Sequence, residues 1–139
     1  LNRDETIHTI LIIDDDPDDQ RLVQKMLDDS GKFQLTTADS GASGWDAIQQ
    51  NRPDAVIMDL FMPDMDGFTL LNKLRSDPDL RTLPVLVISG VDLTAEQHAQ
   101  LAEFGQQLLT KGYLRESDLL DHLEGALHKL RSTNHKKEA

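Results

Sequence analysis

Short apolar runs, each followed by a stretch with helical spacing, recur five times along the chain. Most of the runs are rich in Val, Ile and Leu, as expected of strands that are buried on both faces. They predict strands at residues 7–13, 33–38, 55–58, 85–89 and 108–110. The stretches between them predict helices that begin near Pro17, Ser40, Gly67 and Thr94, and a last helix with Leu120, Leu123, Leu127 and Leu130 on one face.

This alternation of strands and helices predicts parallel strands joined by right-handed crossovers. Five strands are too few for an eight-stranded barrel. We therefore predict an α/β, flavodoxin-like (βα)5 fold: a doubly wound sheet of five parallel strands in the order 2-1-3-4-5, with helices on both faces. The domain is predicted to span residues 7–131, between flexible polar ends at 1–6 and 132–139.

Composition narrows the possible functions. The 139 residues suit one domain, and the 14 Lys and Arg against 25 Asp and Glu give a formal net charge of −11. Such a surface repels nucleic acid and anionic lipid, which argues against direct DNA binding. The chain has no cysteine, which excludes disulfides and thiol catalysis and fits the cytoplasm. The early apolar run at 10–13 is too short for a signal peptide or a membrane span.

Carboxylate, hydroxyl and amine side chains lie at the ends of four of the predicted strands. Asp14 and Asp15 follow the first strand, and Asp59 follows the third. The fourth strand ends in Ser89, and the fifth is followed by Lys111. The carboxyl ends of parallel strands share one edge of the sheet, where ligands bind in open α/β folds. We therefore expect these five side chains to converge.

Clustered carboxylates repel one another, which raises their pKa values or recruits a cation. Oxygen ligands select a hard cation, and Mg²⁺ combines a few carboxylates with waters and a phosphate. Lys111 supplies a positive charge suited to a phosphoryl oxygen, and Ser89 can donate a hydrogen bond to another. The converging set therefore predicts a phosphoryl site with Mg²⁺ or Mn²⁺.

Other acids have simpler interpretations. Asp16 is predicted to cap the first helix, with Asp18 and Asp19 in its solvated first turn, where the helix dipole favours acids. Asp64 and Asp66 are interpreted as turn residues.

The chain resembles the receiver domain of two-component response regulators. The resemblance covers residues 9–130 and rests on ILIIDDDP at 10–17, AVIMDLFMPDMDG at 55–67, LPVLVIS at 83–89 and Lys111. It implies a phosphoacceptor signalling domain in the cytoplasm, which catalyses only its own phosphoryl transfer and dephosphorylation. The implied partners are a histidine kinase or phosphotransfer protein and kinase or effector domains attached outside this chain.

The resemblance also implies residue roles. Asp59 matches the residue that accepts the phosphoryl group, and Asp14 and Asp15 match the acidic pair that holds the metal. Phe61 matches the position whose backbone carbonyl binds the metal. Ser89 and Lys111 match the hydroxyl and the lysine that contact the phosphoryl group.

The sequence departs from the family pattern at several positions. Gly112 replaces the proline that usually follows the lysine, and Leu108 replaces an aromatic residue three positions before it. The usual relay from hydroxyl to aromatic ring is therefore not expected. Phe61 and Val91 are both apolar, and we hypothesise that they position water poorly, so that the phosphorylated state is long-lived.

The stretches GVDLTAEQ at 90–97 and LLTKGYLRESDLL at 108–120 are similar to receivers attached to hybrid sensor kinases. With Leu1 in place of Met, this favours a fragment of a larger signalling protein as much as a stand-alone receiver.

Two other functions remain open at this point. Asp14-Asp15-Asp16 after a strand resembles the nucleophile motif of haloacid-dehalogenase-like phosphatases, although Pro17 follows it and no cap domain is visible. A receiver-like interaction module that takes no phosphate is the second alternative, against which the complete set of acids and Lys111 argues.

Overall fold

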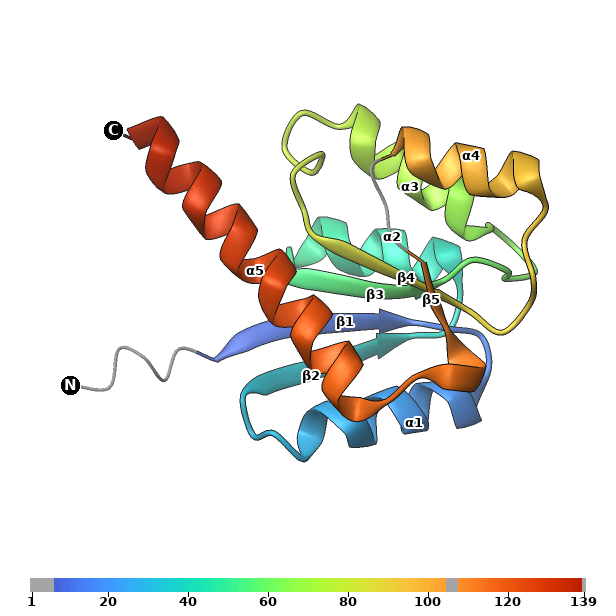
Figure 1. Ribbon diagram of the computed structural model, residues 1–139. Helices are drawn as coiled ribbons and strands as arrows, with labels where there is room; N and C mark the ends of the chain where they lie inside the picture. Colours follow the sequence, from blue (N-terminus) through green and yellow to red (C-terminus); the bar gives the residue numbers. More distant parts are fainter. Residues whose placement is uncertain (1–6, 105–107, 139) are drawn as a thin grey trace.

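The protein folds as a five-stranded parallel sheet in the order β2-β1-β3-β4-β5, in a computed structural model that describes residues 7–104 and 108–138 (Figure 1). The strands are β1 (His8–Ile13), β2 (Phe33–Ala38), β3 (Ala55–Asp59), β4 (Val85–Ser89) and β5 (Leu108–Thr110). The predicted α/β fold and its strand order are confirmed. Residues 1–6, which the sequence indicated as a polar lead-in, lie outside the described residues.

Helices cover both faces of the sheet. They are α1 (Pro17–Asp28), α2 (Gly41–Gln50), α3 (Gly67–Ser76), α4 (Ala95–Glu103) and α5 (Glu116–Glu138), with a 3-10 turn at Lys111–Tyr113 after β5. Buried residues of α1 and α5 join one core cluster, and those of α2, α3 and α4 join the other. The sheet is thus the middle layer of three, as a doubly wound fold requires.

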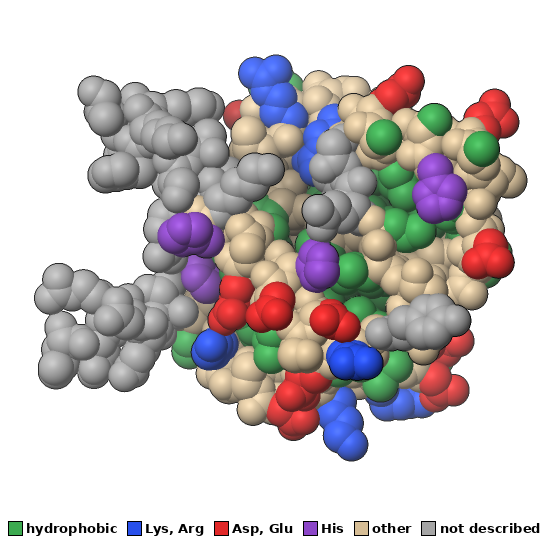
Figure 2. All heavy atoms as spheres, in the orientation of Figure 1, with side chains coloured by type: hydrophobic (Ala, Val, Ile, Leu, Met, Phe, Trp, Pro, Cys, Tyr) green, Lys and Arg blue, Asp and Glu red, His purple; other side chains and the backbone are tan. Residues whose placement is uncertain are grey.

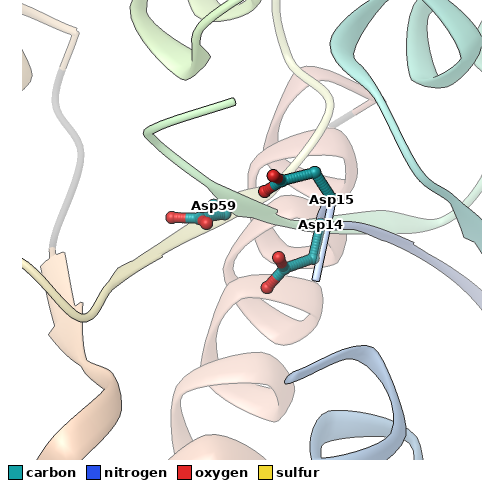
Figure 3. Close-up of side chains that lie close together, drawn as sticks. All are labelled: Asp14, Asp15 and Asp59. Atoms are coloured by element: carbon teal, nitrogen blue, oxygen red, sulfur yellow. The ribbon is translucent and has the colours of Figure 1, made fainter. Parts of the chain in front are cut away.

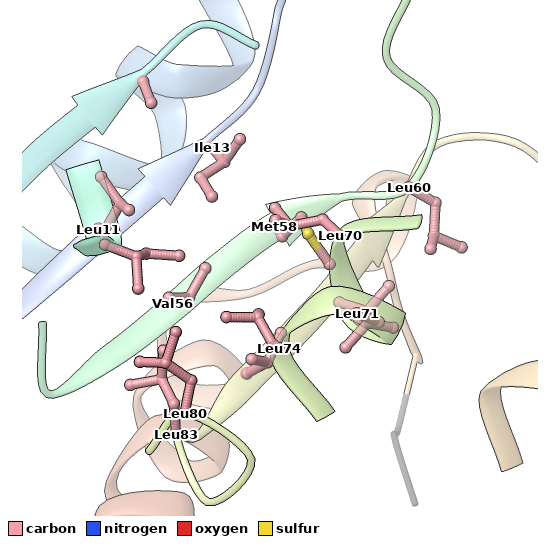
Figure 4. Packing of buried hydrophobic residues seen from close by; sticks show 14 of the residues in the cluster. Leu11, Ile13, Val56, Met58, Leu60, Leu70, Leu71, Leu74, Leu80 and Leu83 are labelled. Atoms are coloured by element: carbon pink, nitrogen blue, oxygen red, sulfur yellow. The ribbon is translucent and has the colours of Figure 1, made fainter. Parts of the chain in front are cut away.

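Alternate residues of the strands supply the two clusters, because successive side chains point to opposite faces. In β1, Ile10 and Ile12 face α1 and α5, whereas Leu11 and Ile13 face the other layer. Figure 4 shows that second layer, in which Leu11, Ile13, Val56 and Met58 meet leucines of α3. The fully buried side chains are aliphatic, in keeping with the scarcity of aromatic residues.

Side-chain caps set the starts of several helices. Asp16 accepts a hydrogen bond from the Asp18 N–H at 2.9 Å, and Pro17 opens α1. Ser40 and Thr94 form capping boxes with Ser43 and Gln97. These contacts satisfy N–H groups that a helix leaves without intrahelical partners. The predicted cap of α1 is therefore confirmed.

The last helix is longer than the sequence indicated. Its backbone is helical to Glu138, whereas the prediction ended the domain at residue 131. No Gly or Pro occurs after Gly125 to stop it. The sequence also predicted that Leu130 belongs to the apolar face of this helix, but its side chain is not among those that the structure describes. In the described chain, no helix has both the length and the apolar character needed to cross a membrane.

Acidic side chains recur over the surface, as the net charge requires. Figure 2 shows Asp and Glu side chains at several places on one face of the molecule, with Lys and Arg side chains among them. Arg21 pairs with Asp18, and Lys32 pairs with Glu124, with all four side chains exposed. Pairs of this kind contribute little to stability.

Candidate functional site

The register of the sheet brings two buried acids side by side. Ile13 pairs with Met58 across β1 and β3, so that Asp14 and Asp59 come next on the two strands. Asp14 is 1% exposed and Asp59 is 7% exposed. Their position at the carboxyl edge of the sheet is the one that the sequence predicted, because both directly follow fully buried apolar runs.

A third acid completes a group that can hold a cation. One carboxylate oxygen from each of Asp14, Asp15 and Asp59 lies within 4.8 Å of the others. Figure 3 shows the three side chains close together, Asp14 and Asp15 after β1 and Asp59 on β3. Asp15 is exposed, whereas the other two are buried, so the group opens to solvent on one side.

The donor set of this group suits a hard cation. Asp14 Oδ1 accepts the Asp16 N–H at 3.0 Å, and buried Asp14 Oδ2 lies 3.0 Å from Lys111 Nζ. One ammonium cannot balance three converging carboxylates, so the group can accept a further positive charge. Three carboxylates that converge on one point offer the oxygen ligands that Mg²⁺ and Mn²⁺ use. The residues therefore fit a divalent metal.

Lys111 links the acids of the edge. Its Nζ lies 2.6 Å from Asp19 Oδ2, 3.0 Å from Asp14 Oδ2 and 3.2 Å from Asp59 Oδ2. The lysine side chain is only 17% exposed. Because water screens it weakly, this ammonium is the main positive charge that offsets the buried carboxylates.

Burial and charge shift the pKa values of these groups. Burial raises the pKa of Asp59 and of Asp14, and the positive charge of Lys111 opposes the rise in both. Burial alone would lower the pKa of Lys111, but hydrogen bonds to Asp19 and Asp14 and the charge of Asp59 raise it. Lys111 is therefore protonated throughout the physiological range.

Ser89 lies at the end of β4, with its hydroxyl engaged by its own loop. The Oγ atom donates to the Val91 carbonyl at 3.0 Å and accepts the Val91 N–H at 3.1 Å. Ser89 is 1% exposed, and Val91 is 61% exposed. The predicted hydroxyl is thus at the predicted edge, and it would have to leave Val91 to reach a group on Asp59.

The chain after Asp59 turns back over the strand end. The Phe61 N–H donates to Asp59 Oδ1 at 3.4 Å, and the Gly67 N–H donates to the Leu60 carbonyl at 2.6 Å. A Cβ atom on Gly67 would lie 2.8 Å from Leu60 Cα, so only glycine allows this close return. The backbone of Phe61 is therefore held against the Asp59 carboxylate.

Asp19 is a contact that the sequence interpretation missed. It was assigned to a solvated helix start together with Asp18, yet it lies against Lys111. The available signal is its spacing, since Asp19 precedes buried Val23 and Leu27 by four and eight residues on α1. Asp18 has no such spacing and is exposed, as predicted.

Comparison with known proteins agrees with this arrangement. The family model described as the response regulator receiver domain matches residues 10–124. The chain is 36% identical over 89 residues to response regulator Rre1 of Synechocystis, a match that covers 64% of this chain and 38% of Rre1. It is 36% identical over 112 residues to the probable transcriptional regulatory protein TcrX of Mycobacterium tuberculosis, covering 81% of this chain and 47% of TcrX. The chain thus spans less than half the length of these two relatives.

A solved structure with the same arrangement is the signal receiver domain of a signal transduction histidine kinase from Syntrophus aciditrophicus. Its TM-score to this chain is 0.79, with 28% sequence identity, and the match covers 88% of this chain and 91% of that one.

Proposed function

This chain belongs to the response regulator receiver domain family, and we propose on that basis that Asp59 accepts a phosphoryl group from a phosphohistidine of a partner protein. The observation that carries the proposal is the buried Asp59 carboxylate beside both the Lys111 ammonium and the Asp14–Asp15 pair. The partner is a histidine kinase or a phosphotransfer protein in the cytoplasm. The chain is a signalling domain that catalyses only the gain and loss of its own phosphoryl group.

The transfer is a nucleophilic displacement at phosphorus. A carboxylate oxygen of Asp59 forms a bond to phosphorus while the bond from phosphorus to the histidine nitrogen breaks. The electron pair stays on the imidazole, which takes up a proton from solvent and is released in its neutral form. Lys111 already lies 3.2 Å from Asp59 Oδ2 and can offset charge on a phosphoryl oxygen there.

In this proposal Asp14, Asp15, Asp59 and the backbone carbonyl of Phe61 would hold the metal. When bound, Mg²⁺ or Mn²⁺ would offset negative charge on the phosphoryl oxygens. The fit rests on the three converging carboxylates, whose charge the single ammonium of Lys111 does not balance.

The signal is a change of charge at the edge of the sheet. The phosphoryl group adds negative charge at Asp59, and the Ser89 hydroxyl can leave Val91 to donate to it. The β4–α4 loop that carries Val91 would then move. Because Leu108 stands in place of an aromatic ring, we propose that this loop itself, and not a ring on β5, passes the change to a partner or an attached domain.

The phosphatase alternative requires the Asp16 carboxylate to act beside Asp14. In the structure, the Asp16 side chain accepts the Asp18 N–H as the cap of α1. Asp16 is exposed, and the acid that adjoins Asp14 at the strand edge is Asp59. The geometry therefore favours a phosphoacceptor at Asp59 over a nucleophile at Asp14.

A phosphorylation assay with a small donor tests the proposal. We expect the chain to gain the mass of one phosphoryl group when it is incubated with acetyl phosphate and Mg²⁺. Asp59→Asn should gain none, and wild type in EDTA should gain little. Asp46→Asn, at an exposed position of α2, is the control that should react like wild type. A wild-type chain that gains no mass would support the phosphate-independent module instead.

A further inference from the structure

The shortest contact of the Lys111 ammonium is with a residue that the proposed reaction does not use. Nζ lies 2.6 Å from Asp19 Oδ2, compared with 3.0 Å from Asp14 and 3.2 Å from Asp59. The Asp19 side chain is 33% exposed, so the pair is partly shielded from water. A short charge-assisted hydrogen bond in such a setting is stronger than an exposed ion pair.

We propose that Asp19 is a positioning residue that holds Lys111 on the α1 side of the site and competes for its ammonium with a phosphoryl group on Asp59. The inference rests on the proposed function, because the phosphoryl group is the competing anion. Its consequence is that Asp19 slows phosphorylation of this chain.

The position of Asp19 is well defined by the first turn of α1. The side chain of Gln20 donates to the Asp14 carbonyl at 2.6 Å and to the Ala38 carbonyl at 3.1 Å. These two bonds tie the start of α1 to the ends of β1 and β2. The backbone that carries Asp19 is thus tied to the strand edge at which Asp14 lies.

The balance of charge points in the same direction. Three carboxylates, one ammonium and a divalent cation would together be neutral, and Asp19 adds one negative charge beside them. A phosphoryl donor is itself an anion, so this charge opposes its approach. When the phosphoryl group arrives, Lys111 must divide its hydrogen bonds between that group and Asp19.

Substitution of Asp19 by asparagine tests the competition. We expect Asp19→Asn to react with phosphoramidate and Mg²⁺ about two- to fivefold faster than wild type, which is the effect of losing one partly shielded ion pair. Asp19→Glu, which keeps the charge, should return the rate toward that of wild type. An Asp19→Asn rate equal to or below the wild-type rate would overturn the proposal.

Asp18→Asn is the matched control. It removes the same charge from the same helix turn, but the Asp18 side chain is 83% exposed and pairs with Arg21. Asp18→Asn therefore changes the net charge and the interaction with the helix dipole in the same way as Asp19→Asn. It leaves the contacts of Lys111 unchanged. An equal acceleration in Asp18→Asn would show a general charge effect and would also overturn the proposal.

A second measurement needs no phosphorylation. Nitrogen-15 NMR can follow hydrogen exchange of the Lys111 ammonium, whose signal is identified by its loss in Lys111→Arg. We expect this exchange to be faster in Asp19→Asn than in wild type, and unchanged in Asp18→Asn. If wild type gains no phosphoryl mass, the proposed function fails, and this measurement still decides whether Asp19 holds Lys111. Exchange that is the same in Asp19→Asn and wild type would refute the contact itself.

Discussion

The ammonium group of Lys111 meets three carboxylates that come from separate parts of the chain: Asp14 after β1, Asp19 in α1 and Asp59 on β3. The contacts of Lys111 with Asp14 and Asp59 could be predicted, because both acids lie at the ends of buried parallel strands, on the same edge of the sheet. The contact with Asp19 was missed because it depends on the rotation of α1 about its axis. Only the spacing of Asp19 from Val23 and Leu27 carried that information.

Because Asp14 is buried, its protonation should change the free energy of unfolding with pH. Burial raises its pKa above the ordinary value of 3.8, so without metal the folded chain binds a proton at Asp14 more tightly than the unfolded chain does. The contribution of Asp14 to the free energy of unfolding should therefore increase as pH falls from 7 toward that ordinary value, and decrease as pH rises through the raised pKa.

Removing this charge should stabilise the metal-free protein. We expect Asp14→Asn in EDTA at pH 7 to raise the thermal midpoint by roughly 3 °C, the shift that about 1 kcal/mol gives in a chain of this size. The gain should shrink at lower pH, where wild-type Asp14 binds its proton. Thermal unfolding by circular dichroism measures both effects, and an Asp14→Asn chain that is less stable than wild type at pH 7 would contradict the argument.

Phe61 makes a prediction about the lifetime of the phosphorylated state. It stands two residues beyond Asp59, and neither its ring nor exposed Val91 offers a hydrogen bond to an attacking water. Hydrolysis joins a water oxygen to phosphorus, breaks the bond to the Asp59 oxygen and releases inorganic phosphate.

We expect Phe61→Asn, whose amide can orient that water, to shorten the phosphoryl half-life roughly tenfold. Phe61→Leu is the apolar control and should keep the wild-type half-life. Decay of the phosphorylated mass after removal of the donor gives the lifetimes. A wild-type half-life of seconds that does not change in Phe61→Asn would show that this position does not limit hydrolysis.

At the scale of elements, the loop between β3 and α3 is anchored to the start of α2. Asp64 accepts the Gly41 N–H at 3.2 Å and the Ala42 N–H at 3.1 Å, and the Ala42 bond lowers the pKa of Asp64. Strands and helices could be predicted because they depend on local spacing and caps. This contact joins residues more than 20 positions apart, and the sequence indicated Asp64 only as a turn residue.

Substitution of Gly41 tests how closely the loop between β3 and α3 packs against the start of α2. A Cβ atom there would clash with the Met65 carbonyl oxygen, which is backbone and cannot rotate away. We expect Gly41→Ala to cost about 1–3 kcal/mol in the free energy of unfolding, as overpacking does. Gly125→Ala in α5 is the control, because its Cβ would meet nothing within 4 Å and should add about 0.5–1 kcal/mol. Urea unfolding measures the free energy of unfolding of both variants. A Gly41→Ala chain as stable as wild type would contradict the close packing of the loop on α2.

At the scale of the whole molecule, the strand order places the functional residues. Asp14 and Asp59 meet because β1 and β3 are neighbours, and Lys111 reaches them from the end of the edge strand β5. The order could be predicted from the alternation of strands and helices together with the family resemblance. The length of α5 could not, because nothing in its polar last turns marks an end.

A bound metal should stabilise the whole fold by mass action. At a Mg²⁺ concentration about 100 times the dissociation constant, the free energy of unfolding should rise by about 2.7 kcal/mol. Asp15→Asn removes one exposed carboxylate of the group and should lose most of this gain, whereas Asp46→Asn should keep it. Thermal midpoints with and without Mg²⁺ make the comparison, and equal gains in Asp15→Asn and wild type would place the metal elsewhere.

The position of the phosphoryl group tests the central claim most directly. The chain would be phosphorylated with acetyl phosphate and Mg²⁺, reduced with borohydride, which converts an acyl phosphate to an alcohol, and sequenced as peptides by mass spectrometry. The account predicts that the reduced side chain is Asp59. Reduction at Asp14, or at no aspartate, would contradict it.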